Sequence, residues 1–380
     1  MELKEYRFDE VTINFDKKRV PLSGAQREKR QGNFRYYGAQ GVIDHIDDFI
    51  FDGTYLLIAE DGENLKSKKQ NIAQVVEGQF WVNNHAHIVQ GNELCNTRYL
   101  CYLLNSMDLS GYVTGSAQPK LSQANLNAVT LFLPSITVQE RIVECLYLFD
   151  KKIAVNQKIN DNLEQQVQAY FQELFVDNAD PAWTLGTISD LGTVVGGSTP
   201  SKSKPEYYTE DGIAWITPKD LSINKAKFIS HGENDITELG LKNSSASIMP
   251  EGTVLFSSRA PIGYIAIASG EVTTNQGFKS VVPKPEIGTA YVYCFLKHNL
   301  PVIEGMASGS TFKEVSGSTM KNVPAVIPDT ETLTCFNDFC APIFAHQRIL
   351  EEQNQSLAAL RDSLLPKLMS GEIDVSAIQL

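Results

Sequence analysis

The carboxylate pair whose spacing comes closest to a nuclease site is Asp329 and Glu331. No lysine follows it, and it stands where a helix is expected to begin, so these acids are expected to serve the helix dipole. Methylation of a base nitrogen needs an N/D-P-P-Y/F loop and a Gly-rich turn, and the segment VGGS at 195–198 lacks the G-x-G spacing. A G-x-x-x-x-G-K-[ST] phosphate loop is also missing from the sequence. We therefore predict a protein that is not an enzyme and has no cofactor.

Histidines and cysteines give no stronger sign of catalysis. His85 and His87 lie two residues apart, as neighbours on one face of a strand would, and no third ligand of metal type is close in sequence. We expect both to serve the framework or to contact a ligand, and we expect no metal. Cys335 and Cys340 fall on an expected helix, where burial is a better explanation than nucleophilic chemistry. All six cysteines are scattered, which is typical of free thiols in a reducing cytoplasm.

A different chemistry is carried by polar, basic and aromatic residues on segments bounded by glycine. Lys and Arg suit phosphate oxygens or guanine edges, Asn and Gln suit adenine, and Tyr packs against sugar or a thymine methyl group. For any one of these residues, the alternative is an ordinary solvated side chain or a turn former. The candidate DNA contacts are Arg27, Lys29, Arg30, Arg35, Tyr36, Tyr37, Gln40, Lys66, Lys68, Lys69, Asn84, His85, Gln118, Lys120, Ser198, Thr199, Ser201, Lys202, Lys219, Lys225, Lys227, Arg259, Asn275, Gln276, Thr311 and Lys313.

The segments that must position these residues occur twice in the chain. Residues 114–135 (TGSAQPKLSQANLNAVTLFLPS) align without a gap to 308–329 (SGSTFKEVSGSTMKNVPAVIPD). Upstream, 97–105 aligns to 289–297, both with a helical pattern, and the region of Asn84 aligns to that of Asn275. Further back, DGTYLLIAEDG (52–62) stands opposite EGTVLFSSRAP (251–261), both containing strand-like runs. Four blocks in the same order indicate an internal duplication.

Each copy ends in a long helical pattern with apolar residues at alternating steps of four and three, as in a heptad seam. Asn156 and Asn160 fill two slots of the first seam, and Asn354 stands at the position equivalent to Asn160. A helix of about 38 residues would extend about 55–60 Å at 1.5 Å per residue, so we expect the two helices to pair with each other. The alternative is that each packs only on its own domain. The expected pairing residues are Ile142, Leu146, Phe149, Ile153, Asn160, Leu163, Val167, Leu350, Asn354, Leu357, Leu364 and Leu368.

The net charge of −12 is unusual for a DNA-binding protein, but it is unevenly distributed. Residues 1–135 hold 14 basic and 16 acidic side chains, and residues 181–328 hold 12 and 13. The two helical segments are more acidic, with 4 basic against 8 acidic residues at 136–180 and 3 against 8 at 329–380. The domains can therefore present basic faces to phosphate while the helices carry most of the acidity. No run of eighteen apolar residues occurs, so membrane spanning is not expected.

With these residues in view, the chain resembles the specificity (S) subunits of type I restriction-modification systems. The motifs that carry the resemblance are YYGAQG (36–41), FDGTYLLIAEDG (51–62), FLPSITVQERI (132–142), GGSTPSK (196–202), WITPKDL (215–221), SSRAPIG (257–263), TNQGF (274–278) and SLLPKLMSGEID (363–374). They cover nearly the whole chain. One departure stands out, because the P-x-x-x-x-Q start of the helix at Pro134 recurs at 328–335 (PDTETLTC) without the Gln. We expect capping or partner contact to differ there.

The resemblance implies an α+β protein with a pseudo-two-fold repeat: two mixed α/β target recognition domains joined by two long helices that pair as an antiparallel coiled coil. The expected domains are 1–135 and 181–328, with spacer helices at 136–180 and 329–380. It further implies that each domain reads one half of a split double-stranded DNA sequence and that the helices set the gap. Two modification (methyltransferase) subunits would bind, with restriction subunits in the full complex. The resemblance places Tyr36, Tyr37, Asn84 and Asn275 in the framework, so the alternative for them is to hold the loops rather than to touch DNA. The alternative function is a coiled-coil scaffold or protein-interaction module that binds no DNA.

Overall fold

The structure is a computed structural model that describes residues 2–67, 70–115, 118–309 and 313–375. Contacts divide it into a first unit, Met1–Ile153 with Ser356–Leu380, and a second unit, Ala154–Gln355. Helices α5 (Ile136–Gln172) and α12 (Thr330–Ser370) each contribute one segment to each unit. Among the described residues, no helix is both long and apolar enough to cross a bilayer.

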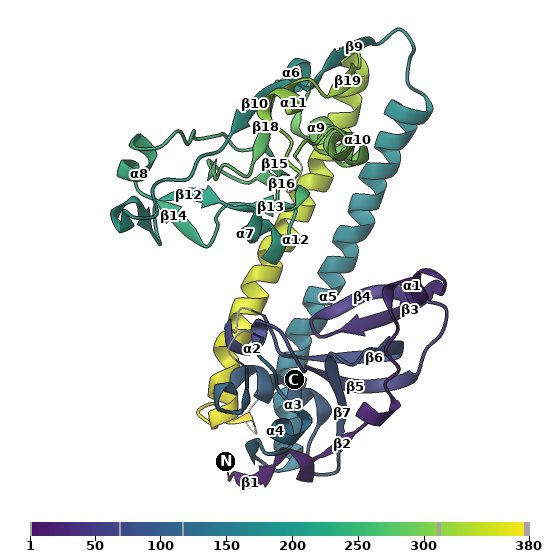
Figure 1. Cartoon of the computed structure of the whole chain (residues 1–380), viewed down its shortest axis with the longest axis vertical. Helices are drawn as coiled ribbons and strands as arrows, with labels where there is room; N and C mark the ends of the chain where they lie inside the picture. The colour runs from purple at the N-terminus through teal and green to yellow at the C-terminus, as the bar shows by residue number, and fades with distance from the viewer. Residues whose placement is uncertain (1, 68–69, 116–117, 310–312, 376–380) are drawn as a thin grey trace. The chain divides into compact units, whose positions relative to one another are not determined.

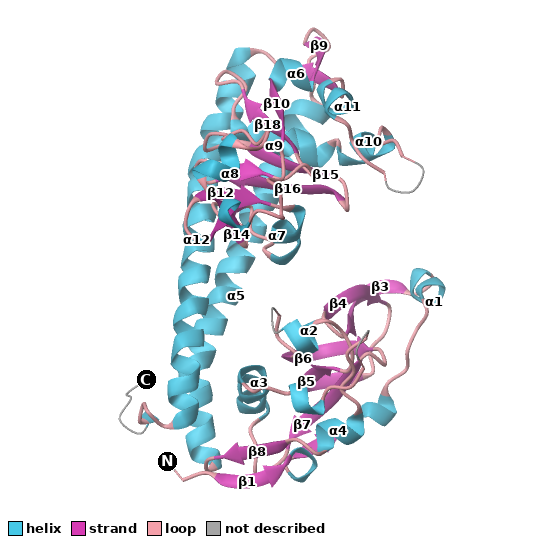
Figure 2. Ribbon diagram, turned by 60° about the vertical axis from the view of Figure 1, so that its left-hand side comes forward, coloured by secondary structure: helices cyan, strands magenta, loops and turns pink. Residues whose placement is uncertain are grey.

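The first unit is built on a six-stranded sheet of order β2-β7-β5-β6-β3-β4, with a separate pair β1-β8. Aromatic and β-branched runs form its long central strands, and buried side chains such as Leu56 and Ile88 face the core. Helix α3 covers the sheet next to β5 and β6 (Figure 2). The elements of the first unit before the long helix are β1 (Lys4–Arg7), η1 (Phe8–Glu10), β2 (Thr12–Asn14), η2 (Asp16–Lys18), α1 (Gly24–Glu28), β3 (Gln31–Gly38), β4 (Gly41–Ile46), β5 (Phe51–Ala59), α2 (Asn64–Ser67), β6 (Ala73–Val82), β7 (Ala86–Gly91), α3 (Thr97–Ser106), η3 (Ser110–Tyr112), α4 (Gln123–Asn127) and β8 (Thr130–Leu133).

The second unit has a five-stranded sheet of order β10-β18-β15-β16-β13, a four-stranded sheet β11-β14-β12-β17 and the pair β19-β9. Helix α9 is buried along its length and packs on β16 (Figure 1). The elements of the second unit between the long helices are η4 (Glu173–Asp177), β9 (Thr184–Thr187), α6 (Ile188–Leu191), β10 (Gly192–Gly196), η5 (Pro205–Tyr207), β11 (Tyr208–Thr209), β12 (Ile213–Ile216), α7 (Pro218–Ile223), β13 (Phe228–Ile229), β14 (Asn234–Ile236), α8 (Glu238–Lys242), β15 (Val254–Ser258), β16 (Ile262–Ala268), β17 (Thr273–Thr274), β18 (Lys279–Pro283), α9 (Thr289–His298), α10 (Leu300–Gly305), α11 (Gly317–Lys321) and β19 (Pro324–Ile327).

The duplication is confirmed by the strand pairing. The order β2-β7-β5-β6 in the first unit has the same connections as β10-β18-β15-β16 in the second. The expected helices at 97–105 and 289–297 are α3 and α9. The alignment of 52–62 with 251–261 was wrong by one residue: Leu56 pairs with Val89 and Val254 with Val281, so Leu56 is equivalent to Val254. The two positive-φ glycines stand at different distances from these equivalent residues, Gly53 three residues before Leu56 and Gly252 two residues before Val254, which explains the misalignment.

Within each unit, the segments of α5 and α12 lie side by side and run in opposite directions. In the second unit, Asn156 Nδ2 donates to Asn354 Oδ1 at 2.9 Å, and Asn160 and Gln347 exchange longer bonds of 3.2 and 3.5 Å. All twelve expected pairing residues are buried or half-buried. They do not face only the other helix, because Ile142 and Leu146 belong to the core of the first unit and Val167 to that of the second. Each helix segment therefore also packs on the domain of its unit.

The two helix starts differ, as the missing Gln predicted. Gln139 is fully buried and its amide donates to the carbonyls of Leu94 and Pro134, both at 2.9 Å, while its Oε1 accepts from Asn96 N at 2.9 Å. The equivalent position in α12 is the buried Leu333. There, Asp329 caps the helix.

The Asp329 carboxylate accepts from the backbone N–H of Thr332 at 2.9 Å and from Trp183 Nε1 at 2.9 Å. The bond from the Thr332 N–H, with those from the Thr332 hydroxyl and Trp183, lowers the pKa of Asp329 to about 2. The expectation that this acid serves the helix start is therefore confirmed.

Candidate nucleic-acid interface

In the second unit, six of the candidate contacts line one open pocket of about 620 Å³. Strands β12 and β17 run parallel and end at its floor, and the turn Asn275-Gln276-Gly277 follows β17 directly. Asn275 Oδ1 accepts from Gly277 N at 2.8 Å, which shapes the turn, while Thr199 donates to the Gln276 amide. The six residues are Thr199, Lys202, Lys219, Arg259, Asn275 and Gln276.

Three basic and two acidic side chains line this pocket, a formal excess of one positive charge. Lys219 Nζ lies 2.7 Å from Glu233 Oε2, so much of its charge is balanced. Asp220 is buried and accepts from Thr217 N at 2.7 Å and Glu233 N at 2.8 Å, so it holds the first turn of α7. Arg259 is half-exposed, with Glu314 3.6 Å away. Amide groups and a partly neutralised guanidinium in one concave surface suit base edges better than phosphate alone.

In the first unit, the candidates divide into two groups. One group lies around the segment that follows β5: Lys120 Nζ is 3.3 Å from Glu60, His85 Nδ1 is 2.7 Å from Asp61, and Lys66 Nζ donates to Gly115 O at 2.9 Å. Gln40 Nε2 reaches Asn64 Oδ1 at 3.5 Å, and Asn84 and Gln118 are exposed.

The other group comprises Arg27, Lys29 and Arg30, which precede β3, and Arg35, which lies within it. Arg27 pairs with Asp44 and Arg30 with Asp47, both at 2.8 Å, while Arg35 donates to the carbonyl of Glu77. Lys29 is exposed between the first two arginines. Since Gln40 follows the other end of the same strand, the structure does not bring these four basic residues together with the first group.

Two clusters of polar side chains, the pocket residues of the second unit and the group that follows β5 in the first, lie on the same backbone frame. Glu60 N donates to His85 O at 2.9 Å and Leu121 N to Glu60 O at 2.8 Å; Ser258 N donates to Gly277 O at 2.7 Å and Val315 N to Ser258 O at 2.9 Å. By these bonds Asp61 is equivalent to Arg259, and Lys120 to Glu314. The charges at the two positions are therefore reversed between the units, on one shared frame.

Burial of their side chains contradicts three of the predicted DNA contacts. Tyr36 is fully buried, with its hydroxyl accepting from Leu22 N at 2.8 Å, and Tyr37 is packed against Phe80. Lys227 is buried between the two long helices and the domain of its unit. Sequence alone could not separate these from exposed residues of the same types.

The pairing of Asn84 with Asn275 was also wrong. Asn83 N donates to Tyr37 O, and its Oδ1 accepts from His85 N, as Asn275 does with Ile216 O and Gly277 N. Asn83 is therefore the framework residue, and the exposed Asn84 is equivalent to Gln276.

The remaining candidates are scattered or outside the described residues. Lys225 lies over the Tyr264 ring at 4.9 Å, Ser198 Oγ accepts from Ser245 N, and Ser201 Oγ bonds Ser203 Oγ. Lys313 is exposed. Lys68, Lys69 and Thr311 lie outside the described residues.

The acidic residues at these positions, such as Asp61 and Glu314, are absent from the predicted contacts because acids repel phosphate. For Asp61, the position directly after a duplicated strand was the available signal.

The histidines and cysteines are placed by local contacts. His87 is buried, with Nδ1 2.6 Å from Asp16 and Nε2 2.8 Å from Leu121 O, so it belongs to the framework. Cys340 is buried, as expected, and burial raises its pKa to about 12. The expectation was wrong for Cys335, which is exposed beside the Tyr170 hydroxyl. All six cysteines are free. No group of three His, Cys, Asp or Glu side chains suited to a metal ion occurs within the described ranges.

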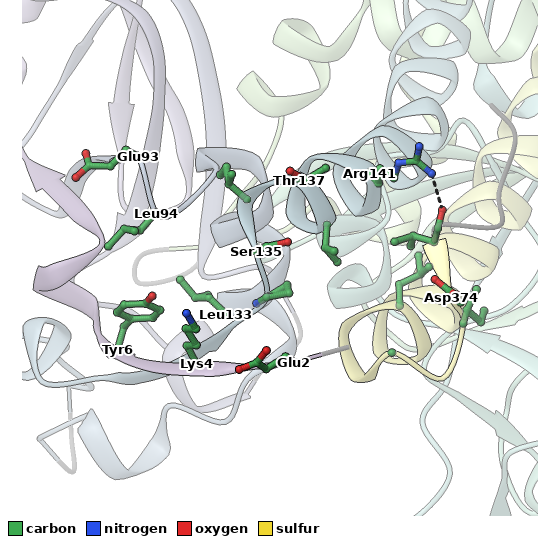
Figure 3. Close-up of a pocket in the computed structure, with 17 residues that line it drawn as sticks. Glu2, Lys4, Tyr6, Glu93, Leu94, Leu133, Ser135, Thr137, Arg141 and Asp374 are labelled. Atoms are coloured by element: carbon green, nitrogen blue, oxygen red, sulfur yellow. Dashed lines mark hydrogen bonds between the residues drawn. The ribbon is translucent and has the colours of Figure 1, made fainter.

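A second pocket, of about 920 Å³, lies in the first unit where α5 begins. Strand β1, the first turns of α5 and the segment after α12 surround it, and Arg141 Nη1 donates to Val375 O at 3.3 Å (Figure 3). None of the candidate DNA contacts lines it. The polar groups at the strand ends are therefore separate from this pocket.

Comparison with known proteins decides the family. The model of the type I restriction modification DNA specificity domain matches twice, at residues 2–165 and 182–353. The chain belongs to this family. Each match contains one unit's sheet and one of the two clusters. Family membership supports a role in DNA recognition specificity, and the scaffold alternative is not favoured.

Relatives agree with this assignment. The MjaIX type I restriction enzyme specificity subunit of Methanocaldococcus jannaschii is 40% identical over 191 residues, which are 48% of this chain and 44% of that relative. A putative type I restriction enzyme specificity subunit of Haemophilus influenzae is 26% identical over 336 residues, covering 84% and 82%. The crystal structure of a type I restriction-modification S subunit from M. genitalium has a TM-score of 0.54 at 15% identity, covering 97% and 96%, and shares the fold.

Proposed function

We propose that this specificity-family chain reads a split double-stranded DNA sequence, with residues 1–135 reading one half and residues 181–328 the other. The observation that supports this most directly is the shared frame with reversed charges, Asp61 and Lys120 in one unit against Arg259 and Glu314 in the other. A duplicated frame that presents different side chains at the same positions suits two different half-sites. The spacer segments 136–180 and 329–380 pair as a coiled coil and set the gap.

In this proposal the chain is itself non-catalytic and uses no cofactor. It acts in the cytoplasm and directs two modification (methyltransferase) subunits, with restriction subunits in the full complex, to the site. Within each unit, the polar clusters supply contacts to base edges and the basic side chains supply contacts to phosphates. Two half-sites read from one side of a duplex should be about 34–36 Å, or a multiple of that distance, apart.

The deciding experiment is methylome sequencing of a host that expresses this chain with its modification subunit. The expected result is a methylated motif of two specified parts separated by unspecified bases. A contiguous motif would overturn the two-reader proposal. Electrophoretic mobility shift of random-sequence duplex, with and without the modification subunit, tests DNA binding itself, and no shift in either condition would favour the scaffold.

An exchange experiment assigns the half-sites. Asn84→Gln in the first unit and Gln276→Asn in the second alter equivalent exposed turn positions while keeping an amide. Each change should alter preference in only one half of the motif. Lys242→Met, on the exposed surface of α8, is the matched control and should leave the motif unchanged.

A further inference from the structure

Lys227 is a buried cation of the second unit with partners on both long helices. Its Nζ lies 2.8 Å from Glu164 Oε2 on α5 and 2.9 Å from Gln347 Oε1 on α12. The ammonium group also lies over the Phe344 ring, 3.4 Å from the centroid, and 4.4 Å from that of Tyr293. One side chain from the domain thus reaches both long helices.

The backbone beside Lys227 is held as well. Both oxygens of Glu351 on α12 accept from successive backbone N–H groups, Lys227 N at 2.8 Å and Phe228 N at 3.0 Å. Phe228 begins β13, the edge strand that pairs parallel to β16 in the main sheet. The sheet is therefore tied to the helix pair through two carboxylates, one on each helix.

The charges of this cluster are balanced. Burial opposes ionisation of Glu164, but Lys227 and Lys297 outweigh it and lower the pKa of Glu164 to about 2. Burial lowers the pKa of Lys227, which Glu164 counteracts, and burial raises the pKa of Glu351. Removing one partner would leave a buried charge without compensation, which is costlier than replacing both by apolar groups.

This cluster occurs in one half of the repeat only. The positions equivalent to Glu164, Gln347 and Glu351 in the other helix are Ala358, Ile153 and Gln157. In the first unit β3 also pairs parallel to β6, but at Phe80–Val82 and not at Val75, the residue equivalent to Ile267 that pairs with β13.

The first unit has a polar cluster of its own in a different place. Asp150 bonds Arg361 and the Tyr102 hydroxyl, and the equivalent positions in the second unit are Phe344, Val167 and Cys294. Each half of a nearly symmetric helix pair thus has a polar cluster whose residues are not repeated in the other half, which opposes alternative registers.

We propose that Lys227 is a positioning residue: with Glu164, Gln347 and Glu351 it sets the register and angle at which the second recognition domain sits on the two helices, and it thereby restricts the gap length that the protein accepts. This inference rests on the proposed reading of a split site. A slide of either helix by one turn, about 5.4 Å, would break the contacts of Lys227 with that helix. The contacts hold the domain on the helix segments of its own unit.

The test measures selectivity for gap length rather than activity. The full chain, in complex with its modification subunits, is bound to duplexes carrying the motif found by methylome sequencing, with the native gap or a gap changed by one or two base pairs. Lys227→Met should reduce the affinity ratio between native and altered gaps about tenfold, a loss comparable to one mismatched base pair. Preference for the bases within each half-site should be unchanged.

Controls separate positioning from simple stability. Because the ratio is independent of the folded fraction, a variant that only destabilises the protein leaves it unchanged, and that outcome for Lys227→Met would overturn the proposal. The double variant Glu164→Leu, Lys227→Met should recover the melting temperature without recovering the ratio; recovery of both would also overturn it. Lys242→Met should alter neither. If the wild-type motif is contiguous, the proposed function fails instead.

Discussion

Replacing Gln139 by leucine tests whether the buried amide at the start of α5 holds the first unit together. Gln139 makes three hydrogen bonds of 2.9 Å: two connect α5 to the segment that caps α3, where the Asn96 side chain accepts from Arg98 N, and one reaches the carbonyl of Pro134 just before α5. At about 1 kcal/mol each they contribute about 3 kcal/mol, of which the apolar leucine recovers roughly 1 kcal/mol. The expected loss for Gln139→Leu is therefore about 2 kcal/mol.

For a unit of this size, that loss corresponds to a melting temperature lower by roughly 4–8 °C. Differential scanning calorimetry measures it, and hydrogen exchange at the Asn96 amide assigns the transition to the first unit, since two units need not unfold together. Gln157→Leu, at an exposed position of the same helix, should change stability by no more than about 0.5 kcal/mol. The second copy has leucine at the equivalent position, 333. An unchanged melting transition and unchanged hydrogen exchange for Gln139→Leu would show that leucine serves equally well at position 139, which would refute the argument.

Three further outcomes are expected. Arg259→Ala should weaken binding by about 1–3 kcal/mol and relax one base position of the second half-site, measured on singly substituted duplexes; equal weakening on all sequences would make it a phosphate contact. Asn156→Leu should destabilise the chain by about 1–3 kcal/mol in denaturant unfolding because Asn354 loses its partner, and adding Asn354→Leu should restore stability; an additive double variant would contradict the pairing. Since the pKa of Glu164 is lowered from 4.5 to about 2, its contribution of about 3 kcal/mol is present above pH 4.5 and lost as the pH falls toward 2; Glu164→Gln should flatten this part of the stability–pH curve, and an unchanged curve would contradict it.

Local patterns predicted the framework well because they depend on neighbouring residues. The repeat aligned 114–135 with 308–329, and the structure confirms it at Ser122 and Ser316, which each cap a short helix by accepting from the backbone N–H three residues later. The absent Gln predicted a different start for α12, which Asp329 provides. The alignment of 52–62 with 251–261 was one residue wrong because a glycine match outweighed the pairing register, which depends on the partner strand.

The candidate interface was predicted less well, because exposure depends on the whole fold. Lys227 is of a residue type that suits a DNA contact, but it is buried against Glu164 and Gln347, which lie 63 and 120 positions away in the chain. Glu314 carries a charge that repels phosphate, yet it lies beside Arg259 in the cluster of the second unit. Neither distinction is present in the residue type or in its neighbours.

The sequence by itself determined that the protein is a duplication with a long heptad-patterned helix after each copy, since repetition and periodicity are properties of the chain. Only the tertiary structure decided which side chains at the strand ends face outward and which buried charges tie a sheet to the helices. The physical reason is that burial and ion pairing join residues far apart in sequence, so a lysine becomes a surface contact or a buried positioning residue only when the helices have packed around it.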